Sequence, residues 1–252
     1  MIPATMSAPV AARSPRLELS LRNLLLLAAP GLAIVLRWGY RWSTPAVMLA
    51  VAPLLAFSFS LPTILRWQAR RFERELLRRL QLRQTDRLRG LYRRQILLRL
   101  FATPSYLAGR RAMIAQELGE PGRARDEFRR ALSGTDEAER LPLLIGLANA
   151  CHQLGRDEEA EPAYREALRR GGRYPAVYHN LAQGLLRRAQ KLDEALELAE
   201  EGLALSGSTG TDALLLLQAE IHSARGDRRR AKELAAQVHP TPETAARIAA
   251  LG

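Results

Sequence analysis

Small apolar residues recur at a nearly constant interval through the second half of the chain. Ala124, Ala160, Ala195 and Ala231 are separated by 36, 35 and 36 residues. The clearest unit, residues 141–172, predicts one helix, a short turn and a second helix. Other members of the repeat lie at fixed offsets from these alanines: Phe128, Tyr164, Ala199, Ala235; Ala131, Ala167, Gly202, Val238; and, on the first helices, Ala112, Ala148, Ala182, Ala219. Because one such hairpin cannot bury its apolar face alone, the pattern predicts a stack of hairpins.

Two of the units share the motif Gly-x4-Ala-x3-aromatic-x2-Ala-Leu. The motif stands at two sets of positions: Gly119, Ala124, Phe128, Ala131, Leu132, and Gly155, Ala160, Tyr164, Ala167, Leu168. The third unit has one residue inserted near residues 189–191, Leu192 in place of the turn glycine, and no aromatic. The fourth unit keeps Gly226 and Ala231.

On these motifs, residues 105–239 resemble the tetratricopeptide repeat family. The resemblance implies an all-α fold, an α-solenoid of about four helix-turn-helix repeats. Residues 241–251, which begin Thr-Pro-Glu, predict a C-terminal capping helix. The repeat domain would then cover residues 105–252, and an unrelated helical bundle is the alternative.

Two apolar stretches precede the repeats, within a predicted membrane anchor over residues 17–65. Residues 42–65 carry no charge and are long enough to cross a bilayer, which takes about 20 residues. Residues 23–36 are also uncharged but shorter, and Pro30-Gly31 interrupts them. We predict a transmembrane helical hairpin. The alternatives are one span with a re-entrant segment, a signal peptide in the first stretch, or no membrane segment.

The positive charge lies in the first third of the chain. Residues 1–99 carry 17 arginines and lysines against 4 acids, whereas residues 100–252 carry 21 against 22. Twelve of these arginines follow the second apolar stretch, within residues 66–99. The positive-inside rule then places the N-terminus and the repeats in the cytoplasm, with the protein in the inner membrane of a bacterium. Residues 1–16, rich in proline and small residues, predict a disordered lead.

Residues 66–104 predict a basic juxtamembrane segment, mostly one helix over residues 66–100 with a possible break at Gly90. Its apolar stripe would dock on the first repeat, and its arginines would contact anionic lipid headgroups. The arginines nearest the apolar stretch are the predicted headgroup contacts: Arg66, Arg70, Arg71 and Arg74. An acidic protein is an alternative partner. Nucleic acid is not expected, because no base-stacking motif accompanies the charge.

The sequence shows no catalytic constellation, so we expect an interaction protein and not an enzyme. The single cysteine, Cys151, cannot form an intramolecular disulfide or a multi-cysteine metal site. The four histidines are spread along the repeat region without metal-ligand spacing, and no phosphate-binding loop or nucleophile elbow is present. We therefore predict no metal and no cofactor.

The family resemblance implies a groove along the first helices that holds a partner. Matched position by position, the groove residues are Tyr106, Met113, Glu117, Ile145, Asn149, Gln153, His179, Gln183, Arg187, Leu216 and Glu220. Asn149 and Asn180 stand where family members that clamp a C-terminal carboxylate have asparagines. Ile145 and Leu217 stand where such a clamp has cations, so we expect a protein segment and not a free carboxylate.

Together these features predict a membrane-anchored scaffold that assembles a membrane complex through its repeats. The layout, though no motif, resembles membrane-tethered repeat subunits of exopolysaccharide secretion and of haem and cytochrome biogenesis. The alternative is a chaperone-like quality-control factor at the same membrane, which would bind many unfolded clients.

Overall fold

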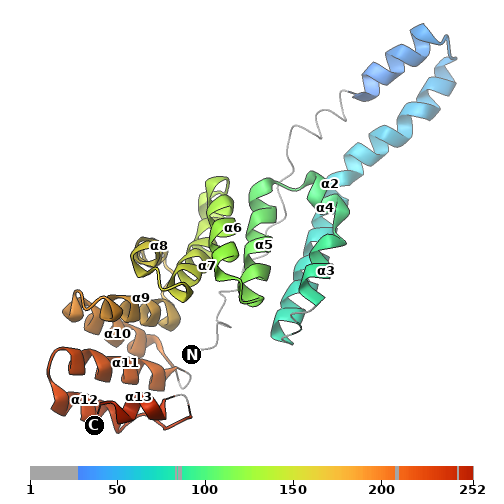
Figure 1. The fold of residues 1–252 in the computed structure, drawn as a ribbon. Coiled ribbons are helices and arrows are strands. Elements are labelled where there is room, and N and C mark those ends of the chain that lie inside the picture. The colour runs from blue at the N-terminus through green and yellow to red at the C-terminus, as the bar shows by residue number, and fades with distance from the viewer. Residues whose placement is uncertain (1–27, 83, 85–86, 208–209, 243, 252) are drawn as a thin grey trace. The chain divides into compact units, whose positions relative to one another are not determined.

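The structure, a computed structural model, describes residues 28–251 except 83, 85–86, 208–209 and 243. Every regular element among these residues is a helix, as Figure 1 shows. The chain divides between Leu118 and Gly119 into two compact units, here called the anchor unit and the repeat unit. The predicted all-α repeat fold is confirmed, while the predicted lead over residues 1–16 lies outside the described residues.

The repeat unit consists of successive antiparallel helices. They are α6 (Pro121–Ser133), the 3₁₀ turn η3 (Glu137–Glu139), α7 (Arg140–Gln153), α8 (Asp157–Arg169), α9 (Pro175–Arg187), α10 (Leu192–Leu205), α11 (Thr211–Ala224), α12 (Arg228–Ala235) and α13 (Ala245–Ala249). From α6 to α12 each helix packs on the next, and α9 also packs on both α7 and α11. The first helices of neighbouring hairpins therefore lie side by side, as expected of a solenoid.

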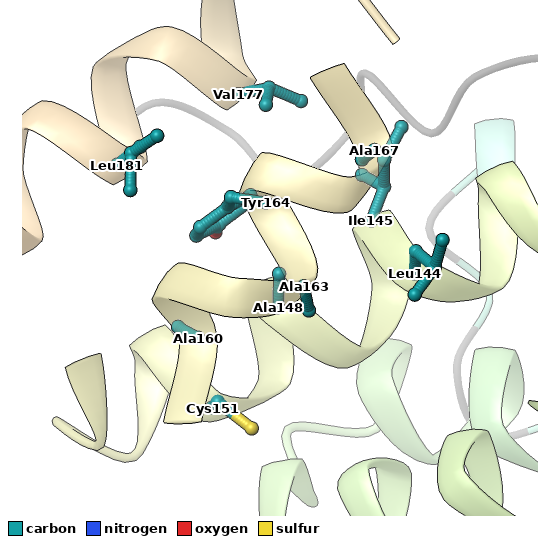
Figure 2. Close-up of a cluster of buried hydrophobic side chains, with 10 residues drawn as sticks. All are labelled: Leu144, Ile145, Ala148, Cys151, Ala160, Ala163, Tyr164, Ala167, Val177 and Leu181. Carbon is teal, nitrogen blue, oxygen red and sulfur yellow. The ribbon is translucent and has the colours of Figure 1, made fainter. Parts of the chain in front are cut away.

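The repeated small residues are the points where these helices meet. Ala124, Ala195 and Ala231 are fully buried, and Ala160 is 2 % exposed. Tyr164 is the largest fully buried side chain, and it packs in a cluster drawn from α7, α8 and α9 (Figure 2). Cys151 is buried in the same cluster, where it serves as a small apolar residue.

The turns inside the hairpins need a left-handed residue. Gly155 has φ +70°, and the amides of Gly155 and Arg156 bond back to the carbonyls of His152 and Cys151. In the third hairpin Ala189 makes the same two-bond turn, with φ +50°. The prediction that Leu192 replaces the turn glycine is therefore wrong: Ala189 does, and Lys191, also left-handed, is part of the insertion that follows.

The C-terminal helix is shorter than predicted. Helix α13 begins after Thr244, while Thr241 forms a turn in which its Oγ1 accepts from the Thr244 amide at 3.2 Å. Ile248 and Leu251 pack against a buried cluster of Ala219, Leu234 and Ala235. This short helix covers the apolar end of the last hairpin, which fits the predicted cap.

The anchor unit is built along one long helix. Its elements are a helical segment over residues 28–34 that runs into the π-helix η1 (Val35–Gly39), then α2 (Thr44–Gln81), α3 (Leu88–Arg93), α4 (Ile96–Phe101) and α5 (Pro104–Glu117). Proline opens α5, where a missing N–H costs nothing, and the Thr103 side chain caps it.

Helix α2 joins the second apolar stretch to the basic segment without a break. The predicted single helix over residues 66–100 is therefore wrong at both ends. It starts 22 residues earlier, at Thr44, and α2 ends at Gln81, before Gly90. Arginine is a good helix former, so the switch from apolar to charged residues does not interrupt the helix.

Two clusters use the same side of α2. Val47 and Val51 pack on Ala29 of the preceding helical segment. Further along, Leu61, Leu65, Ala69, Phe72 and Leu76 form a core with residues of α3, α4 and α5. Of the described helices, α2 alone is long and apolar enough to cross a membrane; the first predicted span lies partly outside the described residues.

Candidate functional site

The predicted groove residues fall in both units. Tyr106, Met113 and Glu117 belong to α5 of the anchor unit. The other eight belong to α7, α9 and α11 of the repeat unit. Each set is described on its own.

In the anchor unit, Tyr106 is held by α2. Its hydroxyl donates to Glu73 Oε1 at 3.2 Å, and the Arg110 guanidinium lies 4.8 Å from the centre of its ring. Arg110 also forms a buried ion pair with Glu73. Burial, with a contribution from Glu73, raises the pKa of Tyr106 to about 12. Tyr106 therefore joins α5 to α2, an arrangement that no local sequence pattern indicates.

The other two residues of α5 are only half-buried. Met113 Sδ accepts a bond from Arg110 at 3.5 Å. Burial raises the pKa of Glu117. Both side chains keep some exposed surface.

In the repeat unit, Asn149 and Asn180 lie at the centre of an amide network. Asn149 Oδ1 accepts from the Tyr164 hydroxyl at 2.7 Å and from Asn180 Nδ2 at 3.1 Å. His179 Nδ1 lies 3.1 Å from Asn180 Oδ1, which suits donation by Nδ1–H. The network fixes both amides, and Asn149 Nδ2 has no partner among the described residues. The position is one from which a partner's carbonyl could be bound.

His179 is buried, and burial lowers its pKa to about 4. Neutral His179 satisfies the amide network with one N–H. Because His179 is buried and bonds to Asn180 Oδ1, it supports the Asn180 amide.

A second network joins α7, α8 and α9 around Asp157. Arg187 Nε donates to Asp157 Oδ2 at 2.8 Å, and the same carboxylate lies 3.0 Å from His152 Nδ1. His152 Nε2 lies 3.0 Å from Gln183 Oε1, and Arg187 Nη2 lies 2.7 Å from Nδ1. We assign the Nε2–H tautomer, in which Nε2 donates to Gln183 and Nδ1 accepts from Arg187, so that Nδ1 makes no hydrogen bond to Asp157. Burial and the Arg187 charge lower the pKa of His152, in agreement with a neutral ring.

Arg187 and Gln183 therefore join the third hairpin to the second. Asp157 is buried at the first turn of α8, where its charge also suits the helix dipole. This role cannot be predicted from sequence, because 30 residues separate Asp157 from Arg187 and no local pattern links them.

Three of the remaining predicted residues are likewise engaged within the protein itself. Ile145 and Leu216 are buried in the core. Glu220 forms two bonds of 2.7 Å with Arg247 of the capping helix. Gln153 is exposed, and it has no hydrogen-bond partner in the described part of the chain. Of the predicted groove positions in the repeat unit, Gln153 and the Asn149 Nδ2 group therefore have no hydrogen-bond partner within the described residues.

The predicted headgroup arginines lie on α2. Arg66, Arg70, Arg71 and Arg74 are all exposed. The Arg71 guanidinium lies 5.5 Å from the centre of the Trp67 ring, and Arg74 Nε donates to the Arg70 carbonyl at 3.3 Å. None of the four forms an ion pair within the residues that the structure describes.

Part of the repeat unit resembles a known protein family. The sequence profile of the tetratricopeptide repeat family matches residues 141–184. No curated protein sequence matches the chain.

Among the solved structures that match, two share the fold over most of this chain. PilF of Pseudomonas aeruginosa is 15 % identical, with a TM-score of 0.59 over 92 % of this chain and 96 % of that chain. PilW, a widely conserved type IV pilus biogenesis factor, is also 15 % identical, with a TM-score of 0.56 over 92 % of this chain and 98 % of that chain. At this identity the likeness concerns the fold alone. We conclude that residues 141–184 are a tetratricopeptide repeat, in a chain with the fold of the tetratricopeptide repeat proteins.

Proposed function

We propose that the protein is a membrane-anchored scaffold that holds a protein partner on its repeats. The observation that carries the proposal is the exposed side of α2, the side opposite the two clusters that pack on it. Along residues 48–59 this side presents Met48, Leu49, Phe57 and Phe59. From Arg66 onward the same side presents arginine.

Such a switch fits a helix that leaves a bilayer. Thr44 and Arg66 are 22 residues apart, which is about 33 Å of helix and matches a hydrocarbon core of about 30 Å. An Arg-Trp pair lies at each end, Arg41-Trp42 and Arg66-Trp67. Exposed tryptophan beside arginine is typical of the membrane interface. A soluble helix would have to leave this apolar side in water.

The helical segment before α2 supports a hairpin arrangement. Ala29, Ala33 and Leu36 pack on the first turns of α2. Trp38 and Tyr40, near the connection between the two helices, are 81 % and 71 % exposed. The arginines after the span outnumber those of the connection, and we propose on this basis that the repeats face the cytoplasm from the inner membrane.

On the repeats we propose that the partner is a protein segment held along α7 and α9. Asn149 and Asn180 are fixed by the amide network and can bond to a peptide backbone, while the exposed Gln153 extends the surface. In the repeat unit the predicted groove positions Ile145, Gln183, Arg187 and Glu220 serve the fold, so the proposed contact surface is smaller than the sequence predicted.

The partner belongs, in this proposal, to a membrane complex of the cell envelope. PilW, which shares the fold, is a type IV pilus biogenesis factor. Assembly of an envelope structure is the setting that agrees with this fold and a membrane anchor. Polysaccharide secretion and cofactor biogenesis are the other settings that the layout suggests.

The test is purification of the tagged full-length protein from its host in a mild detergent, followed by mass spectrometry. A scaffold retains one or two membrane proteins in near-equal amounts. The variant Gln153→Arg, which places bulk and charge on the proposed surface, should release them. Gln190→Arg is the matched control, because Gln190 is also exposed but lies on the turn between α9 and α10.

Other outcomes contradict the proposal. A long list of unfolded proteins in small amounts indicates the chaperone-like alternative. If both variants retain the partner equally, the partner does not bind to the α7–α9 surface. Recovery of the protein from the soluble fraction after an alkaline carbonate wash would exclude the membrane anchor.

A further inference from the structure

The exposed arginines of α2 form one continuous row. Arg66, Arg70, Arg74 and Arg78 follow each other at intervals of four residues, so they lie on one side of the helix. All four are exposed. Within the described residues the only ion pair in the row is between Arg78 and Glu75, at 3.9 Å. Like charges at this spacing repel each other, so the row favours an anionic ligand.

The row begins where the apolar side of α2 ends. The proposed span reaches Leu65, and Trp67 beside it is 55 % exposed with Arg71 stacked near its ring. Side chains on a helix lean toward its N-terminus. On α2 that direction points back to the apolar segment, and the Arg74 bond to the Arg70 carbonyl follows it.

We propose that Arg71 and the membrane-proximal part of this row, Arg66, Arg70 and Arg74, bind the phosphate groups of anionic phospholipids. The proposal rests on the membrane anchor proposed above. It names the ligand that the protein binds where the proposed span meets the polar layer of the bilayer. Anionic phosphate is the chemistry that a guanidinium recognises best.

Distance along the helix limits which arginines can take part. The polar layer of each leaflet is about 5–7 Å thick. Arg70 lies about 6 Å beyond Arg66 and Arg74 about 12 Å, but Arg74 leans back toward the layer. Arg78 lies about 18 Å beyond Arg66, out of reach. The row therefore divides into a lipid-binding part and a part in water.

The same division provides the test. Full-length protein is reconstituted in bilayers that contain spin-labelled phosphatidylglycerol or spin-labelled phosphatidylcholine. Electron paramagnetic resonance then measures the fraction of each lipid that the protein restrains. We expect the protein to select phosphatidylglycerol, with about a fivefold loss of relative affinity for each contacting arginine removed. Salt at 1 M should reduce the selection, since the screening length falls to about 3 Å.

The variant Arg66→Gln/Arg70→Gln should lose most of the selection. The matched control is Arg78→Gln/Arg87→Gln, which removes the same charge from the far end. Arg87 lies there, because its carbonyl accepts from Arg79 Nη1 at 2.9 Å. All four side chains are exposed, so neither variant should unfold the protein.

Three results would overturn the proposal. The protein could restrain both lipids equally, or the control could lose as much selection as the test variant. The third is that Arg66→Gln/Arg70→Gln releases an acidic protein from host membranes while lipid selection is unchanged, in which case the row binds protein. Carbonate extraction of the same samples separates these results from failure of the anchor itself.

Discussion

Arg187, in the last turn of α9, holds the buried carboxylate of Asp157 at the start of α8. The two residues belong to neighbouring hairpins. Gly184 makes this approach possible, because a Cβ atom at position 184 would lie 3.1 Å from Asp157 Oδ1. The contact fixes how the third hairpin sits on the second.

Removal of this tie should weaken the repeat unit. In Arg187→Met the buried Asp157 charge loses its main partner, and we expect the free energy of unfolding to fall by about 1–3 kcal/mol. Arg169→Met is the control: Arg169 pairs with Glu166 of its own helix and is 68 % exposed, so its loss should cost less than about 0.5 kcal/mol. Urea unfolding of both variants measures the difference, and equal losses would contradict the assignment.

The small residues of the repeat make a sharper prediction. A Cβ at Gly146 would lie 2.6 Å and 2.8 Å from two carbons of the Phe128 ring. Gly146→Ala should therefore destabilise the fold by about 1–3 kcal/mol through overpacking. Gly122, inside α6, has open space around it. There, in the first turn of α6, the same change should stabilise by up to about 0.5 kcal/mol, because alanine favours the helix. Thermal unfolding should move in opposite directions for the two variants.

The hairpin turns allow a reciprocal exchange. Gly155 and Ala189 make equivalent left-handed turns at φ +70° and +50°. An L-residue with a side chain pays about 1 kcal/mol in this conformation. Gly155→Ala should lower the free energy of unfolding by about that amount, whereas Ala189→Gly should not lower it and could raise it by up to about 1 kcal/mol. A large loss in Ala189→Gly would show that the third turn is not equivalent.

Acid should loosen the repeat unit through His179. Its pKa of about 4 in the folded protein lies below the ordinary 6.5, so the unfolded chain takes up the proton first. The stability that neutral His179 provides is complete above pH 6.5 and is lost as the pH falls toward 4. At pH 5 this amounts to about 2 kcal/mol relative to pH 7.

The variants His179→Gln and His239→Gln test the assignment. His179→Gln should flatten the dependence of the unfolding free energy between pH 7 and pH 5. His239→Gln is the matched control for the loss of an exposed imidazole, since His239 is 88 % exposed. Burial also lowers the pKa of His152, so a small slope in the same direction should remain in His179→Gln. A full slope in that variant would rule out His179 as its source.

The sequence predicted the repeat architecture well because local spacing determines it. Ala124 and Ala160 recur with a glycine five residues earlier, and both alanines are buried as the spacing requires. The third turn is predicted wrongly because its left-handed residue is not a glycine. An alanine in a left-handed turn looks ordinary in sequence, so the sequence alone favours Leu192 at the glycine position.

The candidate site was harder to predict because partners in space decide it. Position in the repeat marks Arg187 and Glu220 as groove residues, but Asp157 and Arg247 engage them from other helices. Tyr106 is likewise engaged by Glu73, 33 residues earlier. Asn149 and Asn180 were identified by their register alone, and their fixed amides are visible only in the structure.

Because α2 is one unbroken helix, its apolar and cationic sections share a single angular phase. One residue inserted between Leu65 and Arg66 would turn the whole arginine row, with the core packed behind it, by about 100° and raise it by about 1.5 Å. The rotation of the span in the bilayer would therefore determine the direction in which the arginine row and the core on the second half of α2 face. The unbroken helix thus couples the orientations of its apolar and cationic sections, whereas a flexible linker would let the two rotate independently.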